Sequence, residues 1–429
     1  MDIKFWNDLS EDERRSVLTR PAQTSSTKVQ TIVEDIISRI CEEGDSALFE
    51  FSKNLDHYEG DSLELTETEI EKACSDLSPD LKNAIDTAYE NIKNFHAAQN
   101  TDHVELETFP GIVCQTATHP IDSVGLYVPG GSAPLVSTAL MLGVPAQVAG
   151  CAEVILCSPP PISNAIIYAA RKAGVKRIFN LGGAQAIAAM AYGTATVPKV
   201  LKIFGPGNQF VTMAKRLVSN DPNGAAIDMP AGPSEVLVIA DNNAQPSFVA
   251  ADLLSQAEHG PDSQVILVSD SEEFVTKAVA EVDRQLTQLP RKEIAHKALS
   301  KSTAIVVETL EDAVAVSNKY APEHLILQVE DPDALIPFLH NAGSIFVGAF
   351  TPESLGDYAS GTNHTLPTYG YAHTYSALGT ADYRRRYTIQ RASAEGLKAI
   401  APVVETLADA EGLGAHKNAV TVRVSALNK

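Results

Sequence analysis

The chain has 429 residues, of which 44% are hydrophobic and 20% are charged, a balance typical of a globular protein with large buried cores. Its formal net charge of −21 argues against nucleic acid and anionic membranes as partners, because both select proteins with basic faces. The five cysteines include no C-x-x-C pair, so we expect a reducing cytosolic compartment and a metal, if one binds, held by His, Asp, Glu or Gln.

The amino-terminal arm, residues 1–25, is polar and carries the lone tryptophan, Trp6. It lacks the apolar segment of a signal peptide, and no run of about 18 apolar residues predicts a membrane span. We therefore expect a cytoplasmic protein. Because an exposed tryptophan is costly in water, we expect the arm to lie on the body of the protein or on a partner subunit.

Two or three helices are predicted directly after the arm. Apolar residues recur at helical spacing from Val29 to Ile40, and Gly44 ends this pattern. Capping sequences at residues 66–69 and 78–79 predict further helix starts.

From about Val104 onward, short apolar segments alternate with helical ones, and this rhythm predicts parallel sheets covered by helices on both faces. We distribute the strands over two α/β layers, because so many strands do not fit one sheet comfortably. The predicted strands are 111–118, 124–128, 153–157, 176–180, 199–204, 235–240, 264–268, 303–307, 325–329 and 344–347. From about residue 370 the rhythm stops, and a helix near 394–411 with the tail 412–429 is predicted to form a separate small element rather than more sheet.

Three glycine loops follow predicted strands in the middle of the chain, where open parallel sheets bind ligands. Tyr127, Gln185 and Asn208 are the polar residues best placed at these loops to hold a ligand. None of the loops has the G-x-G-x-x-G pattern, and glycine is also common in ordinary strand–helix turns. Nucleotide binding and plain loop hydrogen bonding therefore both fit. The loops are Pro129-Gly130-Gly131, Gly182-Gly183 and Gly205-Pro206-Gly207.

Gln256 and His259 are three residues apart near the end of a predicted helix, so they share one helix face and form a credible pair of metal ligands. A simpler interpretation is also available. A histidine near a helix C-terminus interacts favourably with the helix dipole, and Gly260 as the C′ residue with Pro261 after it would end the helix.

Three further clusters combine acids and histidines. Glu323 and His324 precede the apolar strand LILQV, an arrangement that suits paired general-base catalysis but also fits a solvated turn. Asp357 and His364 lie in a glycine-rich stretch, where Asp357 offers an oxygen ligand and His364 a substrate contact. His416 lies in the tail, where a histidine is usually a surface residue.

Taken together, these clusters closely resemble the histidinol dehydrogenase family over essentially the whole chain. The blocks that carry the resemblance are IDMPAGPSE, ADLLSQAEHGPDSQV, APEHL, SLGDYASGTNHTLPT and EGLGAHKNAV. The resemblance implies an NAD-dependent four-electron oxidation of L-histidinol to L-histidine through bound L-histidinal, the last steps of histidine biosynthesis. Two other functions compete with it: a zinc-dependent amide hydrolase in which Glu323 activates water, and a two-lobed protein that binds a small molecule without catalysis.

The resemblance also implies residue roles. Glu323 and His324 correspond to the catalytic pair. One zinc per subunit would be held by Gln256, His259, Asp357 and His416, although nitrogen and oxygen ligands leave zinc and manganese both open. The NAD contacts would be Tyr127, Gln185 and Asn208. The substrate contacts would be Ser234, Gln256, His259, His324, Asp357, His364, Glu411 and His416.

The implied architecture is two incomplete Rossmann-like parallel-sheet domains with small N- and C-terminal helical elements. We expect the arm 1–25, a large α/β domain of 26–125 with 235–375 that carries the metal and catalytic residues, a second, NAD-binding α/β domain of 126–234, and a C-terminal segment of 376–429. The family forms homodimers with exchanged segments. Glu411 and His416 would therefore reach the active site of the partner subunit.

Overall fold

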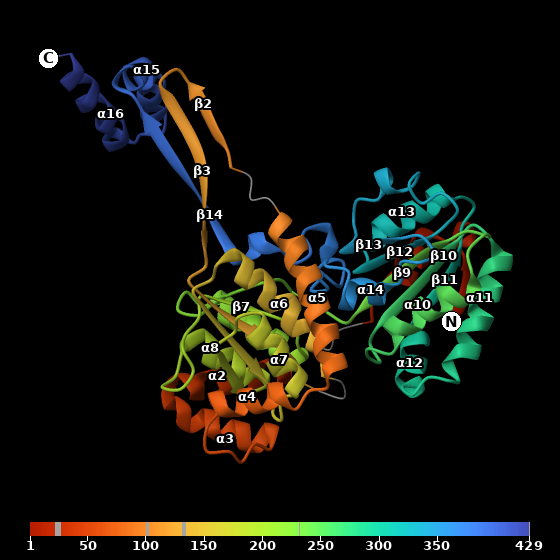
Figure 1. Ribbon diagram of the computed structural model, residues 1–429. Coiled ribbons are helices and arrows are strands. Elements are labelled where there is room, and N and C mark those ends of the chain that lie inside the picture. The colour runs from red at the N-terminus through yellow and green to blue at the C-terminus, as the bar shows by residue number, and fades with distance from the viewer. Residues whose placement is uncertain (22–26, 100–102, 131–133, 231, 429) are drawn as a thin grey trace. The chain divides into compact units, whose positions relative to one another are not determined.

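The computed structural model describes residues 1–429 except 22–26, 100–102, 131–133, 231 and 429 (Figure 1). The chain divides into two units, one of Met1–Ala98 with Asp122–Thr380 and one of Gln99–Ile121 with Ala381–Lys429. The described part of the first unit contains two parallel sheets, which confirms the predicted α/β class with two parallel layers. Among the described residues, every helix is too short or too polar to cross a lipid bilayer.

A six-stranded parallel sheet has the strand order β1-β11-β10-β9-β12-β13. Its central strands are apolar and fully buried, as expected for a sheet covered on both faces. Helices α10, α11 and α12 pack on one face, and α13 with the amino-terminal arm packs on the other. The strands are β1 (Asp2–Phe5), β9 (Glu235–Ala240), β10 (Gln264–Ser269), β11 (Thr303–Val306), β12 (His324–Gln328) and β13 (Ser344–Val347), and the helices are α10 (Pro246–Ala257), α11 (Glu272–Leu286), α12 (Lys292–Leu299) and α13 (Leu310–Tyr320).

The amino-terminal arm lies on this sheet, as predicted from its tryptophan. Trp6 is only 9% exposed, and it belongs to the core beneath α13. Residues Asp2–Phe5 form the edge strand β1, which pairs in parallel with β11. This strand was not predicted from the sequence. Helix α1 (Glu11–Val17) follows, and a capping box between Ser10 and Glu13 fixes its start.

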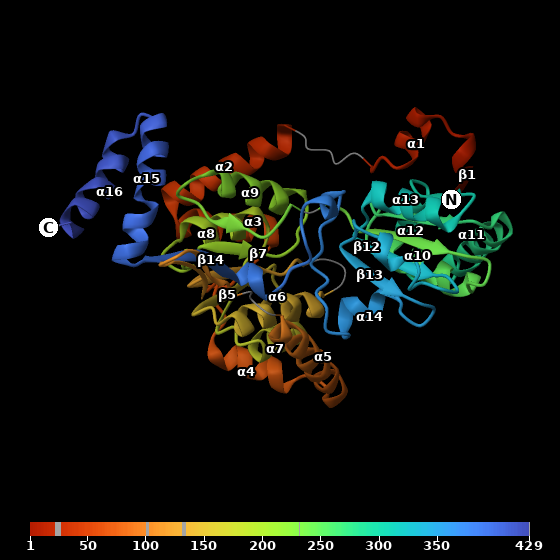
Figure 2. The same cartoon turned by 90° about the horizontal axis from the view of Figure 1, so that it is seen from above.

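A five-stranded parallel sheet has the order β6-β5-β4-β7-β8. Figure 2 shows helices on both of its sides, with α2, α3, α8 and α9 on one side and α4, α5, α6 and α7 on the other. The strands are β4 (Ser123–Tyr127), β5 (Glu153–Ser158), β6 (Arg177–Asn180), β7 (Lys202–Phe204) and β8 (Ala226–Ile227), and the crossover helices are α6 (Val136–Ala149), α7 (Asn164–Lys172), α8 (Gly183–Tyr192) and α9 (Gln209–Asn220).

Four early helices correct the predicted domain plan. The helices α2 (Thr27–Glu43), α3 (Asp45–Asp56), α4 (Glu67–Ser75) and α5 (Pro79–Ala98) were expected in the domain that carries the metal and catalytic residues. They pack instead on the helices of the five-stranded sheet, where the apolar stripe from Val29 to Ile40 joins the core formed by α8 and α9. The expectation was wrong because an apolar stripe shows that a helix has a packing partner but not which one.

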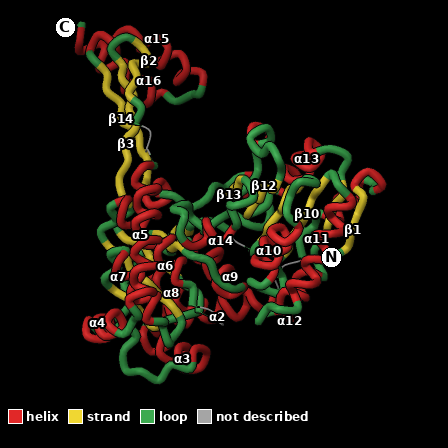
Figure 3. The backbone as a smooth tube through the Cα atoms, turned by 45° about the vertical axis from the view of Figure 1, so that its right-hand side comes forward, coloured by secondary structure: helices red, strands yellow, loops and turns green. Residues whose placement is uncertain are grey.

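The second unit contains an antiparallel sheet in the order β14-β3-β2, followed by two helices. Strands β3 and β14 form a long ladder, visible in Figure 3. The predicted strand at 111–118 therefore exists, but it belongs to this sheet and not to a parallel layer. The elements are β2 (Glu105–Phe109), β3 (Ile112–Pro120), β14 (Arg384–Ala392), α15 (Ala394–Ala410) and α16 (Gly414–Leu427).

The carboxy-terminal segment was predicted to contain no further sheet, and β14 contradicts this prediction. Its sequence, RRRYTIQRA, is mostly charged or polar, and the strand is largely exposed, so it carries little of the apolar alternation that marks a buried strand. Its partner β3 lies more than 260 residues earlier, so the pairing is not visible locally. The helix predicted near 394–411 is confirmed as α15.

A buried ion pair ties the arm to the start of β9. Arg20 Nη2 donates to Glu235 Oε2 at 2.9 Å, and its guanidinium lies 4.0 Å from the ring centroid of Tyr320. The backbone N–H of Tyr369 donates to the same carboxylate at 2.8 Å. Glu235 is the first residue of β9, so this pair fixes the strand end at which several of the predicted site residues lie.

We expect Arg20→Ala to lower the free energy of unfolding by about 3–5 kcal/mol, because it leaves the Glu235 carboxylate buried without its cation. The matched control is Arg15→Ala, which removes an exposed ion pair with Asp12 and should cost less than about 1 kcal/mol. Chemical denaturation measures both. Equally small losses would show that the Arg20–Glu235 pair does not anchor the arm.

Candidate active site

Three polar side chains meet in the core at the amino ends of β9 and β12. Glu323 directly precedes β12, His324 is its first residue, and Gln256 lies in the last turn of α10. Gln256 Nε2 donates to Glu323 Oε2 at 3.3 Å and lies 3.2 Å from His324 Nδ1. The backbone N–H of Glu235 also donates to Glu323 Oε2, at 2.8 Å. All three side chains are at most 6% exposed, so Glu323 and His324 form a buried pair and not a solvated turn.

The hydrogen bonds of His324 define which ring nitrogen is free. Nδ1 lies 3.0 Å from the carbonyl oxygen of Glu235, and a carbonyl only accepts, so Nδ1 carries the hydrogen. In the neutral imidazole the lone pair is therefore on Nε2, which lies 3.5 Å from Asp357 Oδ1. This arrangement leaves Nε2 as the atom that accepts a proton.

Helix α14 (Glu353–Tyr358) brings two acids to the same place, and Figure 3 shows it beside α10. Glu353 and Asp357 are four residues apart and so share a helix face. Their carboxylate oxygens and a ring nitrogen of His259 all lie within 4.8 Å of one another. His364 supports this group, since its Nδ1 bonds to the carbonyl of Asp357 at 3.0 Å and its Nε2 lies 3.2 Å from Thr138 Oγ1.

Three atoms of this cluster are buried without a hydrogen-bond partner among the described residues: Gln256 Oε1, His324 Nε2 and Glu353 Oε2. Buried polar groups are normally paired, and each one left without a partner, water or ligand costs about 1–3 kcal/mol. Three such atoms in one cluster therefore point to a bound ligand. The nitrogen and oxygen donors fit a zinc or manganese ion, which bind such sets.

The carboxylates and the imidazole shift one another's proton affinities. Burial raises the pKa of Glu323 to about 8 and raises that of Glu353 well above its ordinary value. Burial alone would lower the pKa of His324, but the carboxylates of Glu353, Glu323 and Asp357 outweigh it and raise that pKa. Burial would raise the pKa of Asp357, yet its contact with His324 holds it below the usual range.

Two other predicted residues lie near this cluster. The residue His259 is exposed as a whole, but desolvation of its imidazole lowers the pKa of His259. The lowered pKa favours the neutral imidazole that binds metals. It lies two residues beyond the end of α10. The helix was predicted to end at Gly260, but its last residue is Ala257, and Glu258 is its C-cap. Ser234 is half-buried directly before β9.

The three predicted NAD contacts lie at the carboxyl ends of the five-stranded sheet, as expected. Tyr127 ends β4, and its hydroxyl accepts from the backbone N–H of Gly183 at 3.0 Å. Gln185 Nε2 donates to Asp56 Oδ2 at 3.0 Å. Asn208 is the N-cap of α9 and is exposed. Asp56, which the sequence analysis did not single out, also lines a pocket of 730 Å³ at this edge. Gly131 of the first predicted loop lies outside the described residues.

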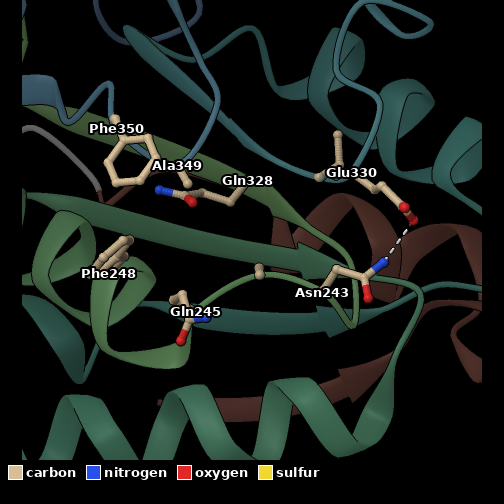
Figure 4. A pocket seen from close by; sticks show the side chains of 9 residues that line it. Asn243, Gln245, Phe248, Gln328, Glu330, Ala349 and Phe350 are labelled. Carbon is tan, nitrogen blue, oxygen red and sulfur yellow. Dashed lines mark hydrogen bonds between the residues drawn. The ribbon is translucent and has the colours of Figure 1, made fainter.

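A second pocket, of 320 Å³, lies at the carboxyl edge of the six-stranded sheet (Figure 4). The cluster of Gln256, Glu323 and His324 lies at the other, amino edge of the same sheet. Figure 4 shows Phe248 and Phe350 on one side of it and the bond from Asn243 Nδ2 to Glu330 Oε2, 2.9 Å long, on the other. Gln328, the last residue of β12, lies beside Ala349 and Phe350. None of the predicted site residues lines this pocket.

The last two predicted residues belong to the second unit of the chain. Glu411 is the C-cap of α15, and His416 lies in the first turn of α16. Both are exposed. The first unit therefore supplies the cluster of Gln256, Glu323 and His324, and the second unit carries Glu411 and His416.

Glu353 is the residue of the cluster that the sequence analysis missed. It is 1% exposed, which is rare for an acid. A signal was present in the sequence, because Glu353 precedes Asp357 by four residues at the start of a short helical segment and so projects from the same face.

Comparison with known proteins identifies the family. The family model described as histidinol dehydrogenase matches residues 18–424. A histidinol dehydrogenase of Vibrio cholerae serotype O1 is 56% identical over 429 residues and is covered in full, as is this chain. One from Photobacterium profundum is 56% identical over 429 residues, with 100% of this chain and 97% of the relative covered. The crystal structure of histidinol dehydrogenase from Elizabethkingia anophelis is 47% identical, with a TM-score of 0.97 and coverage of 100% and 99%.

The chain belongs to the histidinol dehydrogenase family. This membership confirms the family that the sequence motifs predicted, and with it an oxidoreductase of histidine biosynthesis. It does not favour the amide hydrolase or the two-lobed binding protein. The roles of individual residues in this histidinol dehydrogenase family member stay predictions, as do the identity of the metal and the dimer.

We expect a divalent metal to stabilise the protein, because it satisfies the unpartnered buried atoms of the cluster. At a free Zn²⁺ concentration of 100 times the dissociation constant, the gain in unfolding free energy should be about 2.7 kcal/mol. Denaturation with Zn²⁺ and with a chelator measures it. Asp357→Asn should lose most of this gain, and an equal gain in Asp357→Asn and wild type would place the metal elsewhere.

Proposed function

We propose that this chain oxidises L-histidinol to L-histidine in two NAD-dependent steps, with L-histidinal held in the site between them. The observation that carries the proposal is the buried Glu323–His324 pair beside a set of unpartnered metal-binding donors. Membership of the histidinol dehydrogenase family supports the substrate. The acidic composition and the five free cysteines fit a cytoplasmic location.

One zinc ion per subunit is proposed to bind to Gln256, His259 and Asp357 together with His416 of the partner subunit. When bound, zinc would hold the substrate through its imidazole and amino nitrogens, and its charge would favour the neutral form of His324. The cluster at α10, β12 and α14 supports this set, since it gathers three of the four donors. The remaining substrate contacts are proposed to be Ser234, His324, His364 and Glu411 of the partner subunit.

His324 is the proposed base in both oxidations. In the first, His324 Nε2 accepts the proton of the substrate hydroxyl, and a hydride passes from the carbon that bears this hydroxyl to the nicotinamide. An aldehyde and NADH form. The free lone pair on Nε2 supports this assignment. In the second, Glu323 takes a proton from the water that adds to the aldehyde, while His324 returns its proton to the aldehyde oxygen and regains its lone pair. His324 then accepts a hydroxyl proton of the resulting hydrate while a second hydride passes to a second NAD.

Tyr127, Gln185 and Asn208 are the proposed NAD contacts. Their positions at the carboxyl ends of a parallel sheet support this role, because such edges present helix N-termini and backbone donors to phosphates. Asn208 caps the start of α9 and so lies where a phosphate would meet free N–H groups.

We expect purified, zinc-loaded protein to form about two NADH for each L-histidinol consumed, because both oxidations pass a hydride to NAD. Absorbance of NADH measures this ratio directly. A chelator should abolish the reaction and added Zn²⁺ should restore it. Absence of NADH from the loaded protein would reject the dehydrogenase assignment.

A mixture of two inactive variants tests the contribution of the partner chain. In a mixed dimer of Glu323→Gln and His416→Asn, one site combines both defects and the other has neither. Random pairing makes half of the dimers mixed, so we expect about a quarter of the wild-type activity after co-refolding. Each variant refolded alone is the control. A mixture as inactive as either variant would show that His416 serves the site of its own chain.

A further inference from the structure

Glu353 is a buried carboxylate at the candidate active site to which the proposed mechanism gives no role. It lies in the first turn of α14, is 1% exposed, and its Oε2 atom has no hydrogen-bond partner among the described residues. A carboxylate oxygen of Glu353 lies within 4.8 Å of ligand atoms of His259 and Asp357. A buried carboxylate without a hydrogen-bond partner is costly, so this position calls for a positive charge close to Glu353 Oε2.

The imidazole of His324 interacts electrostatically with Glu353 but forms no hydrogen bond with it. Its Nδ1 atom is engaged with the carbonyl of Glu235, and its Nε2 atom, like Glu353 Oε2, has no hydrogen-bond partner within the described part of the chain. The attraction between His324 and Glu353 therefore leaves the hydrogen-bonding capacity of both atoms unused. His324 also lies between two other carboxylates, 3.6 Å from Glu323 and 3.5 Å from Asp357.

The charge of the proposed metal site leaves room for a second carboxylate. A divalent cation brings two positive charges, and Asp357 brings one negative charge. Gln256, His259 and His416 of the partner subunit are neutral ligands, so one positive charge remains. A net charge enclosed in a protein interior is unfavourable, and the carboxylate of Glu353 would bring the sum to zero.

We propose that Glu353 is the second carboxylate of the metal site, facing the ion and neutralising the charge that Asp357 and the neutral ligands leave. This inference rests on the proposed metal site and adds a residue to it. One helix delivers both acids, because Glu353 and Asp357 lie one turn apart on α14. The ion, its ligands and Glu353 would then carry no net charge.

The test is the Zn²⁺ affinity of the full-length protein, freed of metal and titrated against a chelating dye. Glu353→Gln keeps the shape of the side chain and removes its charge, and we expect its affinity to fall by at least about tenfold, in the range for groups that support a metal. Asp241→Asn is the matched control. Asp241 is also a buried acid, but it follows β9 at the carboxyl edge of the sheet, away from the cluster, and its carboxylate accepts from the backbone N–H groups of Asn243 and Glu330, at 2.8 and 2.7 Å. Its loss should leave Zn²⁺ affinity unchanged.

Unchanged affinity in Glu353→Gln, or equal losses in Glu353→Gln and Asp241→Asn, would overturn the inference. Asp357→Asn separates this result from the proposed function. If Asp357→Asn binds Zn²⁺ as the wild type does, the metal site itself is misassigned. If Asp357→Asn loses Zn²⁺ while Glu353→Gln keeps it, only the role of Glu353 is wrong.

A second variant covers the case in which Glu353→Gln does not fold. Glu353→Asp keeps the charge but withdraws it from the cluster by one methylene group. We expect it to bind Zn²⁺ more weakly than the wild type, and wild-type affinity in Glu353→Asp would equally overturn the inference. Circular dichroism confirms that each variant is folded before titration.

Discussion

The burial of several acids around one imidazole, at the amino ends of β9 and β12, is the constraint on which the site depends. A protein of ordinary stability has a margin of only about 5–15 kcal/mol, so unpaired buried groups at about 1–3 kcal/mol each form a large share of it. Such a cluster needs a stable surrounding fold, and a bound ion or substrate that completes it stabilises it further. We therefore infer that the unpartnered atoms of Gln256, His324 and Glu353 make contacts with a bound ion or substrate.

The six-stranded sheet provides the stable framework for this cluster. Its central strands are buried along their whole length, and they place Glu235 and His324 side by side in the sheet. Arg20 holds the Glu235 carboxylate, while the backbone N–H of Glu235 holds Glu323. The amino-terminal arm thus stabilises the strand end that positions Glu323, the residue proposed to activate water. Helices α10 and α14 then add the metal-binding side chains from outside the sheet.

What the sequence revealed about the site was local. The adjacency of Glu323 and His324 and the spacing of Gln256 and His259 are visible in a few residues, and the family motifs connect them across the chain. Burial decides whether such pairs are sites or turns, and burial is a tertiary property. Glu353 was missed for this reason, and so were the true location of the helix that begins near Val29 and the pairing of β14 with β3. For the helix and for β14 the packing partner lies far away in sequence, and local periodicity does not identify it. For Glu353 the spacing to Asp357 was visible in the sequence, but its burial was not.

We propose that one buried pair, Glu323 and His324, serves two successive oxidations, with Glu323 needed only once the aldehyde has formed. A single-turnover measurement of NADH formation by Glu323→Gln, with zinc and excess NAD, tests it most directly. We expect about one NADH per site at close to the wild-type rate, followed by a much slower second one, because only the second step activates water. Equal slowing of both phases in Glu323→Gln would show that Glu323 acts in both oxidations.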